Sequence, residues 1–301
     1  MTDINKSAIR SDYSVLNTLP FFRPSPEALV RQLKDLPGAP KVLHKLQKLA
    51  ASKTSTIGDV VELIVLEPGL SARVVRMSNS THFGGSGRVS DVMEAIQRVG
   101  LTGVQELVTF AIASQLIGKP LTTYHLDAET IWFRSVACAL AAASLAEASD
   151  IDRGEAYTAG LMHGIGLMVI DRFFAEMKSS KTIVSSEYPV DFAPGEREYF
   201  GYSHAEAGAA LLELWGFAPC IVAAVKHQIV PEEAKEHRQL AMILATARWA
   251  RSLFCVPEEN IPKIPEQRWL DEAGIKISDF GPWLDSVRRG YNMARTELRL
   301  Q

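Results

Sequence analysis

Cysteine is scarce in this sequence of 301 residues. The three cysteines, Cys138, Cys220 and Cys255, lie far apart and form no CxxC pair, so neither a disulfide framework nor a thiolate zinc site is expected. This cysteine usage fits a reducing compartment. Residues 1–20 also lack the apolar segment of a signal peptide, and we therefore expect a cytoplasmic protein.

Long apolar runs and an excess of basic charge are lacking as well. The longest apolar stretch, Val136 to Ala146, is far shorter than the roughly 20 residues that a membrane span requires. Lysine and arginine number 32 against 35 aspartates and glutamates, which gives a net charge of -3. A nucleic-acid-binding domain is typically basic. We therefore expect neither a membrane nor a nucleic acid as a partner.

Alternating strand patterns are nearly absent, and helical periodicity dominates from Pro24 onward. Residues 188–192 could be extended, but Pro189 argues against a central strand. Three pairs of residues have the spacing of a capping box at a helix start. These pairs are Thr56 with Asp59, Asp152 with Glu155, and Ser203 with Glu206. The helix that begins at Asp152 is predicted to run towards Phe173, and Pro68 can open another helix. The predicted fold class is all-α.

The breaks between helices divide the chain into four predicted parts. Residues 1–23 form a flexible tail, residues 24–120 an N-terminal helical subdomain, residues 121–255 a helical bundle, and residues 256–301 a C-terminal helical extension. Within the bundle, a long helix over residues 127–148 is rich in alanine. Small side chains let a helix approach its neighbours closely, so this helix is predicted to be central and buried.

Three histidines lie on successive predicted helices of the bundle: His163, His204 and His227. Histidines from neighbouring helices can converge on a metal ion in a bundle core. They can equally be hydrogen-bonded residues at helix ends. Spacing alone leaves both interpretations open.

Several short motifs carry a resemblance to a known family. The segment Leu161–Gly166 resembles the HD motif of the HD superfamily of metal-dependent phosphohydrolases, with Gly164 in the place of the aspartate. The order of the other motifs over roughly residues 30–250 resembles the HDOD family, the HD-related output domains of bacterial signalling proteins. The motif residues to which the resemblance gives a structural role are Pro68, Asn79, Ser80, Phe83, Gly84, Gly166, Trp215 and Gly216.

The resemblance also implies which residues stand at the metal-ligand positions of HD hydrolases. The histidine before the motif is replaced by Arg134, and the later aspartate falls at Thr246 or a position beside it. His204 and His227 match accessory histidines of the related HD-GYP enzymes, and Gln228 stands where a further histidine is expected. The resemblance therefore implies a degenerate site with no catalytic residue.

Elementary electrostatics agrees with that implication. A catalytic dication needs carboxylates for charge balance, whereas Gly164 supplies no ligand and Arg134 adds a positive charge. At about 4 Å and an effective dielectric near 20, the repulsion between an arginine and a dication is on the order of 8 kcal/mol. Glu206 is a possible replacement carboxylate, but its place in a capping box explains it without a functional role.

We therefore expect a non-enzymatic signalling protein without a cofactor, whose partners are other signalling proteins or a second copy of the chain. Trp269, Trp283 and the C-terminal helix could serve either the core or a dimer contact. Two alternatives stay open. One is a phosphohydrolase that holds a divalent metal with unorthodox ligands and acts on a nucleotide or cyclic dinucleotide. The other is a receptor whose degenerate cavity binds a phosphate or nucleotide at Arg134.

Overall fold

The fold of the chain is known from a computed structural model, which describes part of the sequence. The described residues are 23–33, 42, 45–46, 49, 56–66, 68–79, 88–117, 119–177, 182–183, 192–255, 267–274 and 276–297. They contain α-helices, two short 3-10 helices and one isolated bridge between Leu121 and Leu126, with no strand among them. The prediction of an all-α fold is confirmed.

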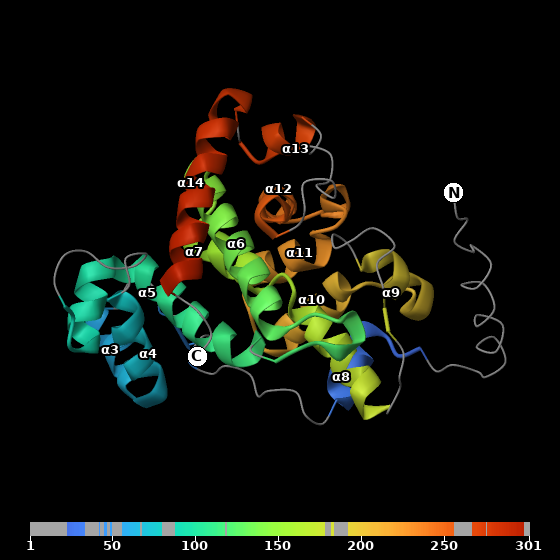
Figure 1. The fold of residues 1–301 in the computed structure, drawn as a ribbon, viewed down its shortest axis with the longest axis horizontal. Helices are drawn as coiled ribbons and strands as arrows, with labels where there is room; N and C mark the ends of the chain where they lie inside the picture. Colours follow the sequence, from blue (N-terminus) through green and yellow to red (C-terminus); the bar gives the residue numbers. More distant parts are fainter. Residues whose placement is uncertain are drawn as a thin grey trace, which may run out of the picture.

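Among the described residues, the helices before residue 118 are four (Figure 1). They are α1 (Pro26–Gln32), α3 (Ile57–Val65), α4 (Pro68–Ser78) and α5 (Val92–Ile117). Pro68 is the first residue of α4, as the sequence predicts. Within α5 the backbone of Gly100 has a φ of 72°, a left-handed conformation that favours glycine, so the helix is kinked at this residue.

The remaining elements form a bundle that fills the centre of the molecule (Figure 1). They are η1 (Thr122–Tyr124), α6 (Ala128–Ala146), α7 (Arg153–Met162), α8 (Ile165–Glu176), α9 (Ala193–Phe200), α10 (His204–Leu214), α11 (Pro219–His227), η2 (Pro231–Glu233), α12 (Arg238–Cys255), α13 (Gln267–Glu272) and α14 (Ile277–Glu297).

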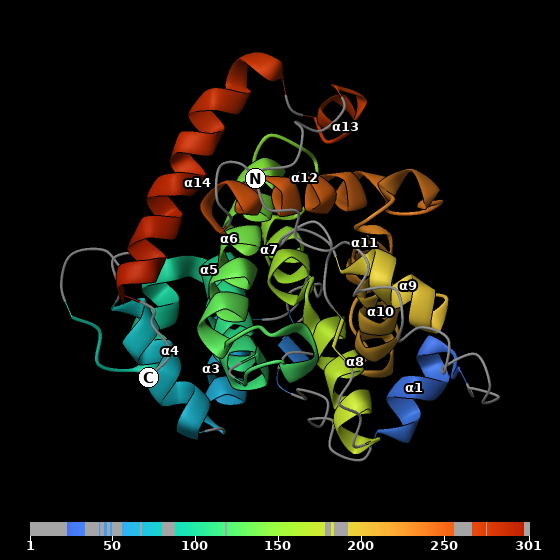
Figure 2. The same ribbon diagram turned by 45° about the vertical axis from the view of Figure 1, so that its right-hand side comes forward.

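Helix α6 is central, as its alanine content predicts. Figure 2 shows it beside α7, with α12 and α14 packed across it. The alanines from Ala137 to Ala143 are fully buried. Gly160 of α7 lies so close to α6 that a methyl group on it would be 2.6 Å from the Cα of Ala139. Small residues on both helices therefore permit the contact between them.

The C-terminal helix α14 belongs to the same core. It packs against α6, and Trp283 is buried within it. The ring of Tyr291 meets the ring of Phe133 edge-on, with 6.2 Å between the ring centroids. The indole N–H of Trp269 donates to the carboxylate of Glu232. Trp283 therefore packs in the hydrophobic core of the chain.

The described helices before residue 118 contact the bundle through helix packing and through polar side chains. Helix α1 packs against α10, and the hydroxyl of Tyr202 donates to the carbonyl of Pro24 at 3.0 Å. Helix α5 packs against α7, where Arg153 pairs with the buried carboxylate of Glu106 at 2.7 Å. The proposed boundary between a subdomain and a bundle near residue 120 stays a prediction.

One prediction about the bundle is wrong, and one of its helices was not predicted. The single helix expected from Asp152 towards Phe173 is broken into α7 and α8 at His163 and Gly164, because the two glycines of this segment weaken a continuous helix. Helix α9 was not expected at all. Within the described residues, no helix combines the length and the hydropathy that crossing a membrane would require.

Candidate functional site

The three candidate histidines all lie at helix ends. His163 is the C-cap of α7, His204 is the first residue of α10, and His227 is the last residue of α11. The structure thus agrees with the second interpretation from the sequence, in which the three histidines are residues at helix ends. Among the described residues, no group of three or more histidines, cysteines, aspartates or glutamates is arranged to hold a metal ion.

His163, the histidine of the HD-like motif, has both ring nitrogens engaged. Its side chain is buried, and Nδ1 lies 2.7 Å from the carbonyl oxygen of Gly160. Nε2 contacts the guanidinium of Arg251 in α12. Because arginine can only donate, Nε2 is the acceptor and Nδ1 carries the proton.

The surroundings of His163 favour its neutral form. Burial holds the pKa of the imidazole well below its ordinary value, and the positive charges of Arg251, Arg248 and Arg134 lower it further. Arg134 and Arg251 are themselves buried. The structure therefore brings the predicted Arg134 to the histidine of the motif and adds two arginines of α12, which the sequence analysis did not single out.

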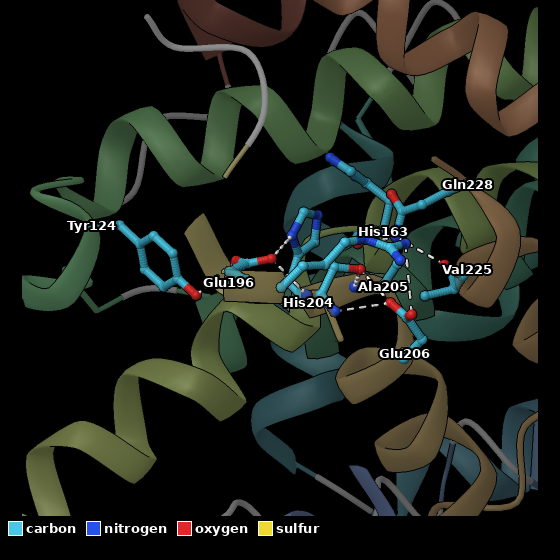
Figure 3. Close-up of polar contacts among 10 residues, drawn as sticks. Tyr124, His163, Glu196, His204, Ala205, Glu206, Val225 and Gln228 are labelled. Atoms are coloured by element: carbon cyan, nitrogen blue, oxygen red, sulfur yellow. Dashed lines mark hydrogen bonds and ion pairs between the residues drawn. The ribbon is translucent and has the colours of Figure 1, made fainter. Parts of the chain in front are cut away.

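Gln228 has a structural contact with the same turn. Its amide donates to the carbonyl of His163 at 2.8 Å and to the carbonyl of Val225 at 2.9 Å. The backbone carbonyl of Gln228 in turn accepts from Arg248 at 2.7 Å. Figure 3 shows Gln228 beside His163 and Val225. Gln228 thus joins α11 to the end of α7. It does so from a position where a histidine is expected in HD-GYP enzymes.

The other two ligand positions supply no charge. Gly164 begins the turn into α8, and a methyl group built on it would meet only the side chain of Leu167, at 3.8 Å. The hydroxyl of Thr246 is buried and donates to the carbonyl of Met242 in its own helix at 2.9 Å.

These residues do not fit the divalent metal that the HD superfamily implies. A metal would need the lone pair of His163 Nε2, which Arg251 uses, and it would need carboxylate ligands. Neither Gly164 nor Thr246 provides one. The positive charges of Arg134, Arg248 and Arg251, which act on His163, would also repel a cation.

His204 takes part in a second buried group, which sequence reasoning missed. Oε2 of Glu196 lies 2.7 Å from both the backbone nitrogen and Nδ1 of His204. The hydroxyl of Tyr124 donates to Oε1 of the same carboxylate at 2.8 Å. All three side chains are buried. Figure 3 shows the carboxylate between the phenol and the imidazole, so this group joins η1, α9 and α10.

Burial keeps the phenol of Tyr124 in its donating form. Its pKa lies well above the ordinary value because the ring is buried and because the Glu196 carboxylate is adjacent. The arrangement can hold the imidazole of His204 in one orientation, as a carboxylate commonly does for a histidine. No signal in the sequence pointed to Glu196, since it lies on the helix that was not expected.

Glu206 has the structural role that its position predicts. Its carboxylate accepts from the backbone N–H of Ser203 at 3.0 Å and completes the capping box of α10. His227 is only half-buried, and its pKa is lowered by burial and by Lys226, with Glu233 and Glu206 opposing. Its ring therefore differs in environment from those of His163 and His204.

The aspartates that flank the motif helix also bind backbone. Asp152 accepts from the backbone N–H of Glu155 at 2.9 Å, which is one half of the predicted capping box. The Glu155 carboxylate instead accepts from the thiol of Cys220, whose pKa is raised by burial and by this neighbouring carboxylate. Asp171 accepts from the backbone N–H of Thr123 at 2.7 Å.

The motif residues with predicted structural roles can be located in part. Asn79 bonds the backbone of Val75 and Val89. Gly166 lies at the contact between α8 and α10. Trp215 is buried at the end of α10, and Gly216 has a φ of 73°. Ser80, Phe83 and Gly84 lie outside the described residues.

The fold is similar to those of several solved bacterial proteins. A candidate phosphohydrolase from Shewanella amazonensis SB2B is 26% identical with a TM-score of 0.64, and the match covers 91% of this chain and 99% of that one. An HDOD domain protein of unknown function from Geobacter sulfurreducens is 21% identical with a TM-score of 0.73, over 92% of this chain and 99% of that one. A candidate signal transduction protein from Marinobacter aquaeolei VT8 is 23% identical with a TM-score of 0.71, over 93% of this chain and 61% of that one.

The sequence comparisons agree with the resemblance of the motifs. An uncharacterized protein of Treponema pallidum (strain Nichols) is 25% identical over 241 residues, which are 78% of this chain and 46% of the relative. The chain thus spans about half the length of this curated relative. A model of the HDOD domain family matches residues 36–231, more than half of the chain. With the all-α fold and the order of the motifs, this match shows that the chain belongs to the HDOD domain family.

Proposed function

We propose that this protein is a regulatory component of bacterial signal transduction that acts through contacts with other proteins and has no hydrolase activity. The observation that carries the proposal is the contact between His163 Nε2 and Arg251. It places a cation at the lone pair that an HD hydrolase uses for metal binding. Because the buried Arg251 occupies this lone pair, we assign His163 and its motif a structural role.

An exposed apolar surface supports the second half of the proposal. Leu66 is 75% exposed, and Ile57, Val65 and Met93 are exposed as well. These residues lie on α3, directly after it, and at the start of α5. Exposed apolar residues that gather in one region commonly mark a protein interaction site, so we place the partner contact on this side of the N-terminal helices.

A groove beside these residues suits a helix of the partner. It has a volume of about 500 Å³ and lies between α3, α4 and the start of α5. Val61, Val75 and Val92 are among its lining residues, and Asp91 is the one ionisable residue among those described there. An amphipathic helix with apolar anchors and a basic residue would match this lining.

The main alternative is a phosphohydrolase with unorthodox metal ligands. The similarity to a candidate phosphohydrolase from Shewanella amazonensis SB2B favours it. For this function Arg251 would have to withdraw from His163, and carboxylates from positions other than 164 and 246 would have to approach, because Gly164 and Thr246 supply none. Glu206 is committed to the cap of α10, and Glu196 is bonded to His204 and Tyr124.

Elemental analysis separates the two functions. We expect the protein, purified from cells grown with added manganese, iron and zinc, to carry far less than one equivalent of metal, and His163→Ala to leave that content unchanged. We also expect no turnover of bis(p-nitrophenyl) phosphate or cyclic dinucleotides with added Mn²⁺. Near-stoichiometric metal that disappears in His163→Ala would move the hydrolase to first place.

The interaction surface has its own matched test. Leu66→Arg and Leu214→Arg both place a charge at an exposed leucine, since the two side chains are 75% and 52% exposed. Leu214 lies at the end of α10, outside the N-terminal helices. We expect a protein captured from extracts of the source cells by the unaltered chain to be lost with Leu66→Arg and kept with Leu214→Arg. Equal capture by both variants would contradict the proposed surface.

A further inference from the structure

A pocket lies beside the HD-like motif and has no part in the function proposed above. It is formed by one face of α8, by residues 116–117 at the end of α5 and by residues 119–121 before η1, and Ile131 of α6 contributes to the wall. Its volume is about 280 Å³, close to the lower end of the roughly 300–1,000 Å³ that small-molecule sites span. The pocket therefore has room for a small ligand.

The lining of the pocket is largely apolar. The buried side chains are those of Leu116, Ile117, Leu121, Ile131, Ile165 and Met168. Removing apolar ligand surface from water against such side chains is favourable at roughly 25 cal/mol per Å². A ligand without an apolar body would forgo this contribution.

Two cations accompany these apolar side chains. Lys119 is exposed and Arg172 is half-exposed, and both line the pocket. Within the described part of the chain, neither forms an ion pair. An anionic group of a ligand in the pocket could therefore form an ion pair with each of them.

The single carboxylate of the lining is already engaged. Asp171 accepts from the backbone N–H of Thr123 at 2.7 Å and lies 3.4 Å from the hydroxyl of Thr122. These hydrogen bonds join η1 to α8. Among the described residues, the Asp171 carboxylate forms no ion pair with Lys119 or Arg172. The ionisable residues of the pocket thus comprise two cations and one hydrogen-bonded carboxylate, which favours a negatively charged ligand.

We propose that this pocket binds a small organic acid with an apolar body, such as a medium-chain or aryl carboxylate, whose anionic group pairs with Lys119 and Arg172. The pocket also includes Gly164, the residue after His163. A bound acid would contact the α7–α8 turn and the α5–η1 junction together and would stabilise their relative placement. The binding site would thereby give this signalling protein a chemical input.

Calorimetric titration with matched ligands tests the proposal. Octanoate and phenylacetate should bind the full-length protein. Octanol has the apolar chain of octanoate without the carboxylate, and acetate has the carboxylate without the apolar chain. Both should therefore bind much more weakly than octanoate. Adenosine 5′-monophosphate, a polar phosphate, should not bind. The proposal would be overturned if octanol or acetate bound as tightly as octanoate. It would also be overturned if the nucleotide bound and octanoate did not, or if neither octanoate nor phenylacetate bound.

Substitution of the two cations tests the location. Lys119→Gln combined with Arg172→Gln should weaken octanoate binding about tenfold, because each of the two partly exposed charge pairs contributes about threefold in affinity. Lys226→Gln removes an exposed cation of α11 and should leave the affinity unchanged. The methyl resonance of Met168 should shift on titration in the unaltered protein. Unchanged affinity in the double variant, or a shift at other methionines alone, would place the acid elsewhere. Metal content and hydrolysis do not enter these measurements, so their outcome is independent of the proposed function.

Discussion

Gly166 of α8 lies directly against the backbone of His204, the first residue of α10. A methyl group on Gly166 would overlap the carbonyl oxygen of His204 and lie 2.6 Å from the backbone nitrogen of Gly208. A methyl group on Gly208 would in turn lie 3.0 Å from the backbone nitrogen of Gly166. Two glycines thus allow α8 and α10 to touch, and this contact places the motif turn beside the His204 group.

Gly166→Ala should therefore destabilise the protein strongly. Backbone atoms cannot move aside as a flexible side chain can, so we expect a loss of about 3 kcal/mol in the free energy of unfolding, at the upper end of the usual range for overpacking. Urea unfolding followed by circular dichroism measures this loss. Gly164→Ala is the matched control, since its methyl group would meet only Leu167 at 3.8 Å. Equal stability of the two variants would contradict the close approach.

Asn79 should hold together the two ends of the segment that follows α4. Its amide donates to the carbonyls of Val75 and Val89, both at 2.9 Å, and its oxygen accepts from the backbone N–H of Val89 at 2.7 Å. Asn79→Ala removes all of these bonds, and we expect a cost of about 1–3 kcal/mol. Hydrogen exchange of the Val89 amide should accelerate more than exchange in α10. Exchange that accelerates equally in both places would show a global effect instead.

Tyr124→Phe should cost more than the same change at another buried tyrosine. The hydroxyl of Tyr124 donates to the carboxylate of Glu196, and its loss leaves a buried acceptor short of a partner. We expect a loss of about 1.5–3 kcal/mol in unfolding free energy. Tyr202→Phe is the control, because that hydroxyl donates to the neutral carbonyl of Pro24, where about 1 kcal/mol is typical. A larger loss at Tyr202 would contradict the role of the Glu196 group.

Much of the helical architecture could be predicted, because it depends on local signals. The central place of α6 follows from its alanines. The caps of α3 and α10 follow from Thr56 with Asp59 and Ser203 with Glu206. Each of these signals lies within a few residues of the feature that it specifies. The family motifs also put His163 and Arg134 at metal-ligand positions of HD hydrolases, and the charge of Arg134 contributes to the lowered pKa of the His163 imidazole, after burial, Arg251 and Arg248.

Helix α9 was missed because its buried positions do not look apolar. They are Ala193, Glu196 and Phe200, which have helical spacing but include a carboxylate. Glu196 is compatible with burial only because Tyr124 and His204 bind it, and these partners are 72 and 8 residues away in the chain. A hydrophobic pattern cannot report such a contact.

The arginine at His163 was missed for a related reason. Arg251 is 88 residues from His163 in the sequence, on a helix whose rotation no local signal in the sequence specifies. The sequence analysis considered Thr246 on the same helix, where the aspartate of HD hydrolases is expected. Only tertiary packing decides which residues of α12 face α7.

Stability of the protein should fall in mildly acidic solution because of His163. Its pKa in the folded protein lies well below the value of 6.5 that applies to an exposed histidine, so the unfolded chain binds a proton that the folded protein excludes. The resulting stabilisation is complete above pH 6.5 and is lost as the pH falls towards the folded pKa, at up to about 1.4 kcal/mol per pH unit. Urea unfolding between pH 6.5 and pH 5 should therefore show stability falling as the pH is lowered.

His163→Gln isolates this contribution from that of the carboxylates. Glutamine does not titrate, and its amide oxygen can accept from Arg251, so urea unfolding of the variant should show a shallower pH dependence than the unaltered protein over the same interval. His237→Asn is the matched control: His237 is exposed and has a φ of 53°, a conformation that asparagine tolerates. This control should follow the unaltered protein. If His163→Gln also followed it, the imidazole would be protonated in the folded state, Nε2 could not accept from Arg251, and the argument against metal binding at His163 would lose its basis.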